Sequence, residues 1–178
     1  MKIVVITGSP RKNSTSNYLA DEFIKGASEN GHEIYKFDSN KANMKHCIAC
    51  DSCGRGLKPC IFKDDFIELK EHILKSDLIV FVTPVYYFDM ASNLKKVIDR
   101  LYSINNTVTS MKKKSILITS QHSELESVKD SLNSIYLSIS NWMNMTNLGI
   151  INALGIDNIE QMKQTPYPKQ AYELGKNI

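Results

Sequence analysis

The sequence predicts a doubly wound α/β fold: a five-stranded parallel sheet in the order 2-1-3-4-5, with helices on both faces. Two observations lead to this prediction. Apolar runs of strand length alternate along the chain with stretches that have the helical hydrophobic period. One of these runs, residues 78–82, is apolar without alternation, which is typical of a strand covered on both faces. Because 178 residues fit one domain, we expect residues 1–178 to form a single unit.

The elements follow one another regularly. The first helix is expected to end at Gly31, and the second to be capped by Asp64 and Asp65. The third strand runs into T-P-V-Y-Y-F, where we expect Pro84 to stop further pairing. The third helix carries apolar residues at the spacing of a stripe that faces a sheet. The expected strands are residues 3–6, 32–37, 78–82, 115–119 and 148–154, and the expected later helices are residues 94–101, 125–142 and 171–176.

Composition excludes several classes of protein. With 42% hydrophobic and 23% charged residues, the chain matches an ordinary globular domain rather than a disordered one. The net charge is only +3, and the lysines at 112–114 are expected to be a solvated start of a strand rather than part of a nucleic-acid surface. No apolar run reaches the ~20 residues of a membrane helix, and no signal peptide precedes the first strand. We therefore expect a cytoplasmic protein that binds neither nucleic acid nor membrane.

The turn at residues 7–16, T-G-S-P-R-K-N-S-T-S, lies between the first strand and the first helix. A helix that begins here directs its unpaired N–H groups and its positive dipole end at the turn, where phosphate is the usual ligand. The turn is neither a Walker loop nor G-x-G-x-x-G. A polar turn with a simple helix cap would use the same residue types. The candidate phosphate donors are Ser9, Arg11, Ser14, Thr15 and Ser16.

A second loop lies close to this turn in the expected sheet. In the order 2-1-3-4-5 the chain adds strands on one side of the first strand and then on the other, so the strand order reverses between the first and third strands. Ligands of such sheets bind beyond the carboxyl ends of the strands at that point. The turn at 7–16 and the loop T-P-V-Y-Y-F meet there. One offers a phosphate site, and the other offers aromatic rings and backbone groups. A flat ring system that carries a phosphate would fit both.

These two loops resemble a known family. G-S-P-R-K-N-S-T-S after the first strand, with T-P-V-Y-Y-F-D-M-A-S-N-L-K-K-V-I-D-R-L after the third, resembles the flavodoxin-like NAD(P)H-dependent FMN reductases. Within that family the chain is most similar to the branch that includes the iron–sulfur flavoproteins. The resemblance implies a flavodoxin-like fold, FMN as cofactor, NAD(P)H as co-substrate and a homodimer or homotetramer.

The resemblance also implies residue roles. The phosphate of FMN would be held by the five turn residues named above, where family members often carry Gly-Asn-Thr in place of Ser14-Thr15-Ser16. The isoalloxazine ring would lie against the loop after the third strand, chiefly on its backbone N–H groups. The turn after the fourth strand, at residues 119–122, would close the other side of the ring. The residues implied at the ring are Pro84, Val85, Tyr86, Tyr87, Phe88, Ser120 and Gln121.

All four cysteines lie in a stretch without clear periodicity, residues 39–63. Their spacing is C-x2-C-x2-C-x6-C, formed by Cys47, Cys50, Cys53 and Cys60. Compact thiolate sets of this kind suit a cubane [4Fe–4S] cluster, and the motif resembles that of the iron–sulfur flavoproteins. Relatives without a cluster carry a similar loop. One alternative is a zinc site. The other is a set of free thiols, in which Cys60 or Cys53 could form a disulfide.

Two histidines, His72 and His122, are expected to have no role in chemistry, whereas for His46 two interpretations stay open, tuning of a cluster on the adjacent cysteines or no role. His72 is expected to be solvated on the second helix, His46 adjoins Cys47, and His122 follows the fourth strand as a plain loop residue. The chain has no conventional nucleophile motif, so no side chain is expected to be catalytic and the cofactor would carry the chemistry.

Three functions remain. The first is an NAD(P)H-dependent oxidoreductase in which FMN passes electrons to a quinone-, nitro- or flavin-type acceptor. The second is an electron carrier with a [4Fe–4S] cluster on the four cysteines and ferredoxin as partner. The third is a non-catalytic flavin-binding sensor whose cysteine loop responds to thiol oxidation.

Overall fold

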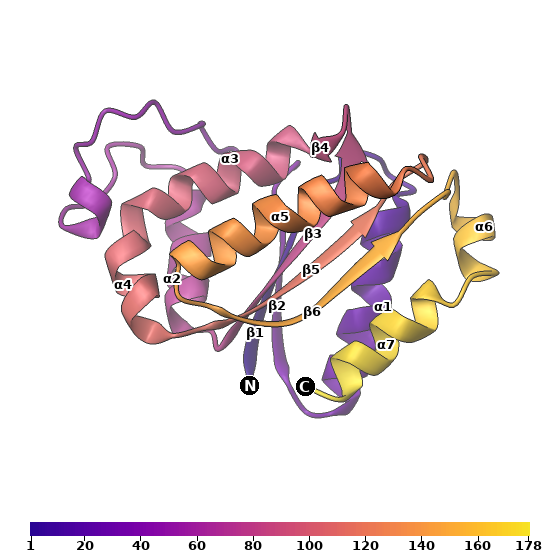
Figure 1. The fold of residues 1–178 in the computed structure, drawn as a ribbon. Coiled ribbons are helices and arrows are strands. Elements are labelled where there is room, and N and C mark those ends of the chain that lie inside the picture. Colours follow the sequence, from indigo (N-terminus) through magenta and orange to yellow (C-terminus); the bar gives the residue numbers. More distant parts are fainter.

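The computed structural model describes all of residues 1–178. Its parallel strands are β1 (Lys2–Thr7), β2 (Glu33–Asp38), β3 (Leu78–Tyr86), β5 (Lys114–Ser120) and β6 (Thr146–Ala153). They form one sheet in the order β2-β1-β3-β5-β6. Counted among the parallel strands alone, this is the predicted order 2-1-3-4-5. The predicted fold class is confirmed, and the carboxyl ends of the strands meet at one edge (Figure 1).

Helices cover both faces of the sheet (Figure 1). One face carries α1 (Thr15–Glu29), α6 (Ile159–Lys163) and α7 (Tyr167–Lys176), and the other carries α2 (Phe66–Lys75), α3 (Ser92–Arg100) and α5 (Glu126–Trp142). Two apolar clusters lie between these layers. Val4 and Ile6 belong to one cluster, and Ile3 and Val5 to the other. An uninterrupted apolar strand therefore fills two cores, because successive side chains point to opposite faces.

Three short helical elements complete the chain. The 3₁₀ turn η2 (Leu101–Ile104) and the helix α4 (Asn105–Met111) continue from α3 toward β5. The predicted irregular stretch at 39–63 contains only the 3₁₀ turn η1 (Gly54–Gly56). Residues 45–64 form the cysteine loop, which lies at the end of α3 remote from β4 (Figure 1).

The prediction for Pro84 was wrong. Pro84 still faces Ser120 in the β3–β5 ladder, and β3 then continues to Tyr86. Val85 and Tyr86 pair with the short antiparallel strand β4 (Asp89–Met90). Proline removes one N–H from a ladder, and here the strand changes partner directly after it. The sheet therefore gains a small hairpin at the carboxyl end of its central strand.

Two expectations about charged surface residues were also wrong. Lys113 is buried, and its ammonium group donates to the backbone carbonyls of Leu74 and Ser76 at the end of α2. That burial lowers the pKa of Lys113. His72, expected to be solvated, is half-buried and stacks on the ring of Tyr35 with centroids 3.4 Å apart.

Candidate functional site

The turn after β1 packs tightly against the start of α3. The N–H of Gly8 donates to the carbonyl of Val82 on β3 at 2.9 Å. A Cβ atom on Gly8 would lie 2.8 Å from the Cβ of Leu94, so only glycine fits without a shift. The turn is thereby held beside the end of β3, as the switch-point argument predicts.

Hydroxyl groups gather where α1 begins. Ser14 is the N-cap, and its Oγ accepts from the N–H of Asn17 at 3.2 Å. The hydroxyls of Ser14 and Ser16 lie 3.0 Å apart, and both side chains are buried. Ser9 is buried as well, and its Oγ accepts from the N–H of Arg11. The first turn of α1 contains no acidic residue that would oppose an anion.

Two contacts join this turn to neighbouring strands. The hydroxyl of Ser120, at the end of β5, donates to Oγ1 of Thr15 at 2.9 Å. The guanidinium carbon of Arg11 lies 5.8 Å from the ring centroid of Tyr86, at the end of β3. Residues from each of the three predicted loops therefore lie together at one edge of the sheet.

Unsatisfied polar atoms mark the same edge. Five buried side-chain polar atoms in the chain have no hydrogen-bond partner. Three of them belong to Asn17, Tyr86 and Gln121, in the first turn of α1 and at the ends of β3 and β5. Native proteins leave few such groups unpaired, so each needs an explanation. A ligand at the carboxyl edge that presents N–H or O–H donors would give the two amide oxygens, of Asn17 and Gln121, a partner.

The segment after Pro84 forms a hairpin with β4 instead of the plain loop that was expected. Thr83 fixes its base, because its Oγ1 accepts from the N–H of Ala91 at 2.9 Å and donates to the carbonyl of Pro84 at 2.7 Å. Tyr86 is half-buried beneath Arg11. Tyr87 and Phe88 instead form the tip of the β3–β4 hairpin, with 97% and 61% of their surfaces exposed. Of the residues implied at the ring, these two project away from the hydroxyl groups.

The turn after β5 closes the far side of this edge. Gln121 is buried, and its amide nitrogen donates to the carbonyl of Ser123 at 2.7 Å. His122 is exposed and pairs with the carboxylate of Asp157 in the loop after β6. That pairing was not predicted, and it gives His122 a contact between two loops.

The four cysteines line a separate cavity of about 880 Å³, together with the ends of α3 and α5. Cys50 is exposed and Cys53 is buried. Hydrogen bonds from Ser52 lower the pKa of the Cys50 thiol, whereas burial raises that of Cys53. No three of the chain's His, Cys, Asp and Glu side chains come together as a metal site. The thiols are therefore not gathered into a ligand set for a [4Fe–4S] cluster or a zinc ion.

This cavity lies away from the carboxyl edge. Its walls include residues 98–103, at the end of α3, whereas the start of α3 packs on Gly8. The nine residues of α3 span about 14 Å along the helix axis. The sequence predicted both the carboxyl-edge site and the cysteine site but not the distance between them. That distance depends on the direction in which α3 runs, which is set by its packing on the sheet.

Comparison with known proteins agrees with this arrangement. The model of a family described as NADPH-dependent FMN reductase matches residues 1–153. The chain belongs to this family. The resemblance seen in the two loops is thereby confirmed. An iron-sulfur flavoprotein from Archaeoglobus fulgidus is 33% identical over 102 residues, which cover 57% of this chain and 46% of that protein. The chain spans about half the length of the curated relatives it matches.

Solved structures of the same fold are also similar. An NAD(P)H:quinone oxidoreductase from Methanothermobacter marburgensis superposes with a TM-score of 0.83 at 20% identity, covering 99% of this chain and 95% of that one. An FMN-dependent NADH-azoreductase from Bacillus anthracis, solved in complex with FMN, has a TM-score of 0.71 at 16% identity and 98% coverage of both chains. At these identities the likeness shows the fold. None of the helices has the length and apolarity needed to span a membrane.

Several residues of the site were missed by sequence reasoning. Asn17 contributes to the carboxyl edge and has no distinctive sequence signal, whereas Thr83 begins the T-P-V-Y-Y-F motif but was not assigned a role. Arg100 and Asp64 close the base of the cysteine loop through a buried ion pair. Asp64 was predicted only as part of the cap of α2; the N-cap residue is Asp65, and Asp64 contributes because its Oδ1 accepts from the N–H of Phe66, the first residue of the helix.

Proposed function

We propose that this protein is an FMN-dependent NAD(P)H oxidoreductase whose acceptor is a small quinone-, nitro- or flavin-type molecule. The observation that carries this proposal is the convergence of buried hydroxyls and unpaired polar atoms at the β1–β3 switch point. Family membership and the FMN complex of the similar azoreductase support the choice of cofactor. We further propose that residues 1–178 form one FMN-binding domain.

The residues of the turn would hold the phosphate. Ser9, Ser14 and Ser16 supply buried hydroxyls, and the start of α1 supplies backbone N–H groups without intrahelical partners. Arg11 supplies a charge at the mouth. Thr15 is held by Ser120 and thereby fixes the distance between α1 and β5.

The ring would lie between the ends of β3 and β5. Pro84, Val85 and Tyr86 form one wall, and Ser120 and Gln121 form the other. When bound, FMN would supply the two-electron chemistry, taking hydride from NAD(P)H and reducing the acceptor. The protein's part is to orient the ring through a rigid hairpin base and to leave one face open for the nicotinamide.

A titration of the protein with FMN tests this proposal. The wild-type protein should bind one FMN per chain, and the loaded protein should oxidise NADH or NADPH with menadione as acceptor. Ser16→Ala should weaken FMN binding about fivefold by removing one hydroxyl donor. The matched control is Ser138→Ala, on the exposed surface of α5 far from the turn. Absence of FMN binding by the wild type would exclude the proposal.

The similarity to iron-sulfur flavoproteins favours a second candidate, an electron carrier with a cluster on the cysteine loop and ferredoxin as partner. All four cysteines line one cavity, but their thiols do not converge. Iron and acid-labile sulfide on anaerobically purified protein decide between the two functions. Four irons per chain would support the carrier, and no iron with full FMN occupancy would exclude it.

The sensor function, the homodimer or homotetramer and the cytoplasmic location stay predictions. The free-thiol alternative suits the sensor, because an exposed thiol with a lowered pKa reacts most readily. Absence of NAD(P)H oxidation by FMN-loaded protein would favour the sensor over the oxidoreductase.

A further inference from the structure

The cavity beside the cysteine loop is large enough for a small molecule. Its volume is about 880 Å³, and pockets that bind small molecules usually measure about 300–1,000 Å³. Protein interiors are otherwise close-packed, so the chain's own side chains leave this space open. Because α3 begins beside Gly8 and ends at the cavity, the cavity lies apart from the carboxyl edge.

Apolar side chains make up most of the cavity wall. Fourteen of the 20 lining residues are hydrophobic. The ends of α3 and α5 contribute Ile98, Leu101, Ile139 and Trp142, and the cysteine loop contributes Phe62 and the four cysteines. A protonated thiol packs as a small apolar group. The wall therefore favours an apolar molecule.

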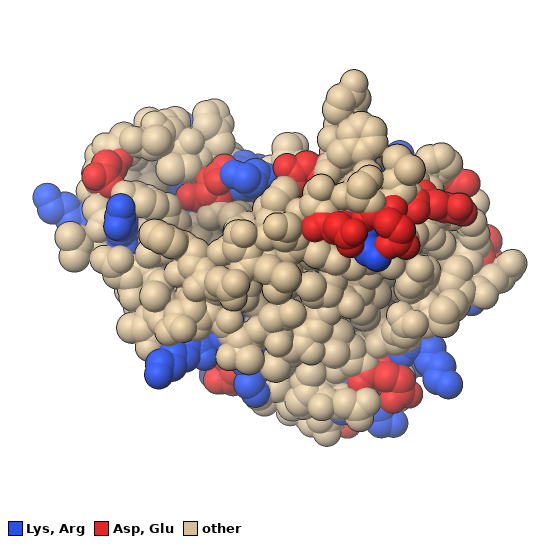
Figure 2. Space-filling view, in the orientation of Figure 1, with Lys and Arg blue, Asp and Glu red and all other residues tan.

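Trp142 lies at the open side of the cavity, since it lines the cavity and 68% of its surface is exposed. Its indole N–H donates to the side-chain oxygen of Asn105 at 3.1 Å, so the polar atom of the ring already has a partner. Residues 131–141 of α5 carry no charge, and Figure 2 shows an uncharged surface along this half of the helix. A large exposed apolar group beside a cavity usually marks a binding site.

A buried hydrogen-bond donor lines the same cavity. The side chain of Arg100 is 1% exposed, and its two terminal nitrogens donate to Asp64 and to the carbonyl of Lys45. The third nitrogen, Nε, is buried and has no hydrogen-bond partner. A buried donor without an acceptor is costly, and native proteins leave few of them. An acceptor atom of a bound molecule is the partner that the cavity can supply.

The charges in the cavity wall are nearly balanced. Arg100 is paired with Asp64, and Asp99 is paired with the exposed Lys95. Asp51 is the remaining charged residue of the wall, and it has no ion-pair partner. A wall with one unbalanced carboxylate repels an anion.

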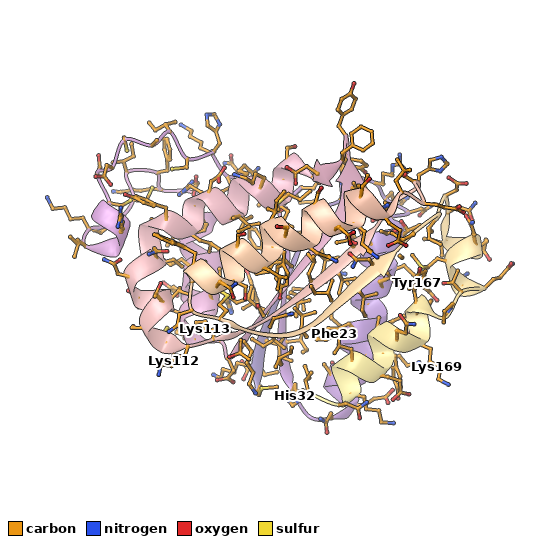
Figure 3. The ribbon with its side chains drawn as sticks, in the orientation of Figure 1. Phe23, His32, Lys112, Lys113, Tyr167 and Lys169 are labelled. Atoms are coloured by element: carbon orange, nitrogen blue, oxygen red, sulfur yellow. The ribbon has the colours of Figure 1, made fainter.

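Cations close to the cavity do not reverse this balance. Those of the cysteine loop are exposed and do not form part of the wall, so water and salt screen them. They are Lys45, Arg55, Lys58 and Lys63. Lys112 and Lys113, labelled in Figure 3, precede β5 and do not line the cavity either. A carbonyl oxygen, which accepts without carrying a charge, therefore suits Nε of Arg100 better than a carboxylate does.

We propose that this cavity is a second ligand site, which binds a neutral and mainly apolar molecule whose carbonyl oxygen accepts from Nε of Arg100. The inference does not depend on the proposed function, because none of the residues assigned to FMN lines the cavity. Since Arg100 also joins Lys45 to Asp64, a bound ligand should stabilise the base of the cysteine loop.

Three naphthalenes of nearly equal size test the proposal. Acetylnaphthalene carries a ketone, ethylnaphthalene lacks it, and naphthoate carries a negative charge. Calorimetric titration of the purified protein, with and without added FMN, should show saturable binding of acetylnaphthalene that FMN does not alter. Ethylnaphthalene should bind about tenfold more weakly, because a hydrogen bond to a charged donor is lost. Naphthoate should also bind more weakly than the ketone.

Substitutions on α5 locate the ligand. Trp142→Ala should weaken binding of acetylnaphthalene about five- to tenfold, because an aromatic wall is removed. Leu137→Ala is the matched control, since Leu137 is an exposed apolar residue of the same helix that does not line the cavity. It should leave the affinity unchanged. Both side chains are exposed, so both variants should fold, and circular dichroism checks this.

Five results would overturn the inference. Absence of saturable binding of acetylnaphthalene would exclude the site. Equal affinities for the ketone and the ethyl compound would exclude Nε of Arg100 as the partner. Equal losses in Trp142→Ala and Leu137→Ala would indicate nonspecific adsorption, and competition by FMN would place the ligand at the carboxyl edge. An iron–sulfur cluster in the purified protein, together with no binding of acetylnaphthalene, would assign the cavity to the cluster.

Discussion

The guanidinium of Arg100 and the carboxylate of Asp64 form a two-point ion pair, with N–O distances of 2.8 and 3.1 Å. Their side chains are only 1% and 8% exposed. The same guanidinium donates to the carbonyl of Lys45 at 2.8 Å, and the N–H of Lys45 donates to Asp64. One side chain at the end of α3 therefore joins both ends of the cysteine loop.

Removing one partner of this pair should be costly. Arg100→Met leaves the Asp64 carboxylate buried without its cation, and it frees both ends of the cysteine loop. Breaking a buried pair in this way typically costs about 3–5 kcal/mol of unfolding free energy. Urea unfolding of the variant measures the loss. Asp64→Leu should cost a similar amount, and the double variant should cost less than the sum of the two.

The control for this prediction lies on the same helix. Lys95 and Asp99 form an exposed ion pair on α3. Lys95→Ala should change the unfolding free energy by less than about 1 kcal/mol, because exposed pairs contribute little. Equal effects at Lys95 and Arg100 would mean that the buried pair does not hold the loop.

The same pair should make stability depend on acid. Burial raises the pKa of Asp64, but hydrogen bonds from Arg100 and from the N–H of Lys45 outweigh this effect, so the net pKa is lowered. A carboxyl whose pKa falls on folding stabilises the protein above its unfolded pKa of about 3.9, and that stability is lost as pH falls through the folded pKa. Urea unfolding between about pH 2 and pH 6 should show a shallower pH dependence in Asp64→Asn than in the wild type. Parallel curves would contradict the prediction.

The sequence predicted the strands and their order because apolar runs of strand length and crossover handedness leave few arrangements. Local features set by distant contacts were less predictable. Pro84 indicates the end of a strand locally, yet the hairpin with Asp89 and Met90 provides new partners beyond it. Lys113 belongs to a charged run, and only the three-dimensional path of α2 brings backbone carbonyls to its ammonium group.

The candidate site shows the same division. The hydroxyl-rich turn could be predicted because the start of a helix after a strand has fixed chemistry. The outward direction of Tyr87 and Phe88 could not, since it depends on a turn type that their residue types disfavour. Likewise, the cysteine spacing suggests ligands, but the placement of the thiols depends on how Arg100 closes the loop.

The packing of α7 on α1 depends on two glycines. A Cβ atom on Gly26 would lie 2.1 Å from the carbonyl oxygen of Tyr172, and one on Gly175 would lie 2.1 Å from that of Phe23. Gly26→Ala should therefore destabilise the protein by about 1–3 kcal/mol, although alanine ordinarily favours a helix. Thermal unfolding measures the change. Ser28→Ala, at an exposed position of α1, is the control and should be neutral or slightly stabilising.

A buried hydroxyl network joins α5 to the sheet. The hydroxyl of Tyr136 lies 2.9 Å from Ser115 Oγ and donates to the side-chain oxygen of Asn147 at 2.9 Å. Tyr136→Phe should cost about 1–3 kcal/mol, because Ser115 and Asn147 lose a buried partner. Urea unfolding of this variant beside Tyr102→Phe, an exposed tyrosine, checks the prediction.

The network also predicts behaviour at high pH. Burial raises the pKa of Tyr136 to about 12. A tyrosine whose pKa rises on folding stabilises the protein below its unfolded pKa of about 10, and this stability is lost as pH rises through 12. The wild type should lose stability between pH 10 and 12 more steeply than Tyr136→Phe.

Arg11 offers the most direct test of the phosphate site. Arg11 is exposed, its backbone N–H donates to the buried hydroxyl of Ser9, and its guanidinium lies over the ring of Tyr86. Arg11→Ala should weaken FMN binding by about 1.5 kcal/mol, roughly tenfold, because a charge-assisted contact is lost from a solvent-facing position. Riboflavin lacks the phosphate, so the Arg11→Ala variant should bind it with an affinity within about twofold of that of the wild type. The small remaining change would come from the lost contact between Arg11 and Tyr86.

Lys12→Ala is the control for Arg11, because Lys12 is the neighbouring exposed cation of the same turn. Fluorescence titrations with FMN and riboflavin at two salt concentrations separate the possibilities. A specific contact at Arg11 weakens FMN binding much more than loss of Lys12 does, and the difference persists at high salt. If both variants lose affinity equally, and only at low salt, the two cations attract the phosphate without a specific contact. The phosphate would then be held by the hydroxyls and by the backbone N–H groups at the start of α1.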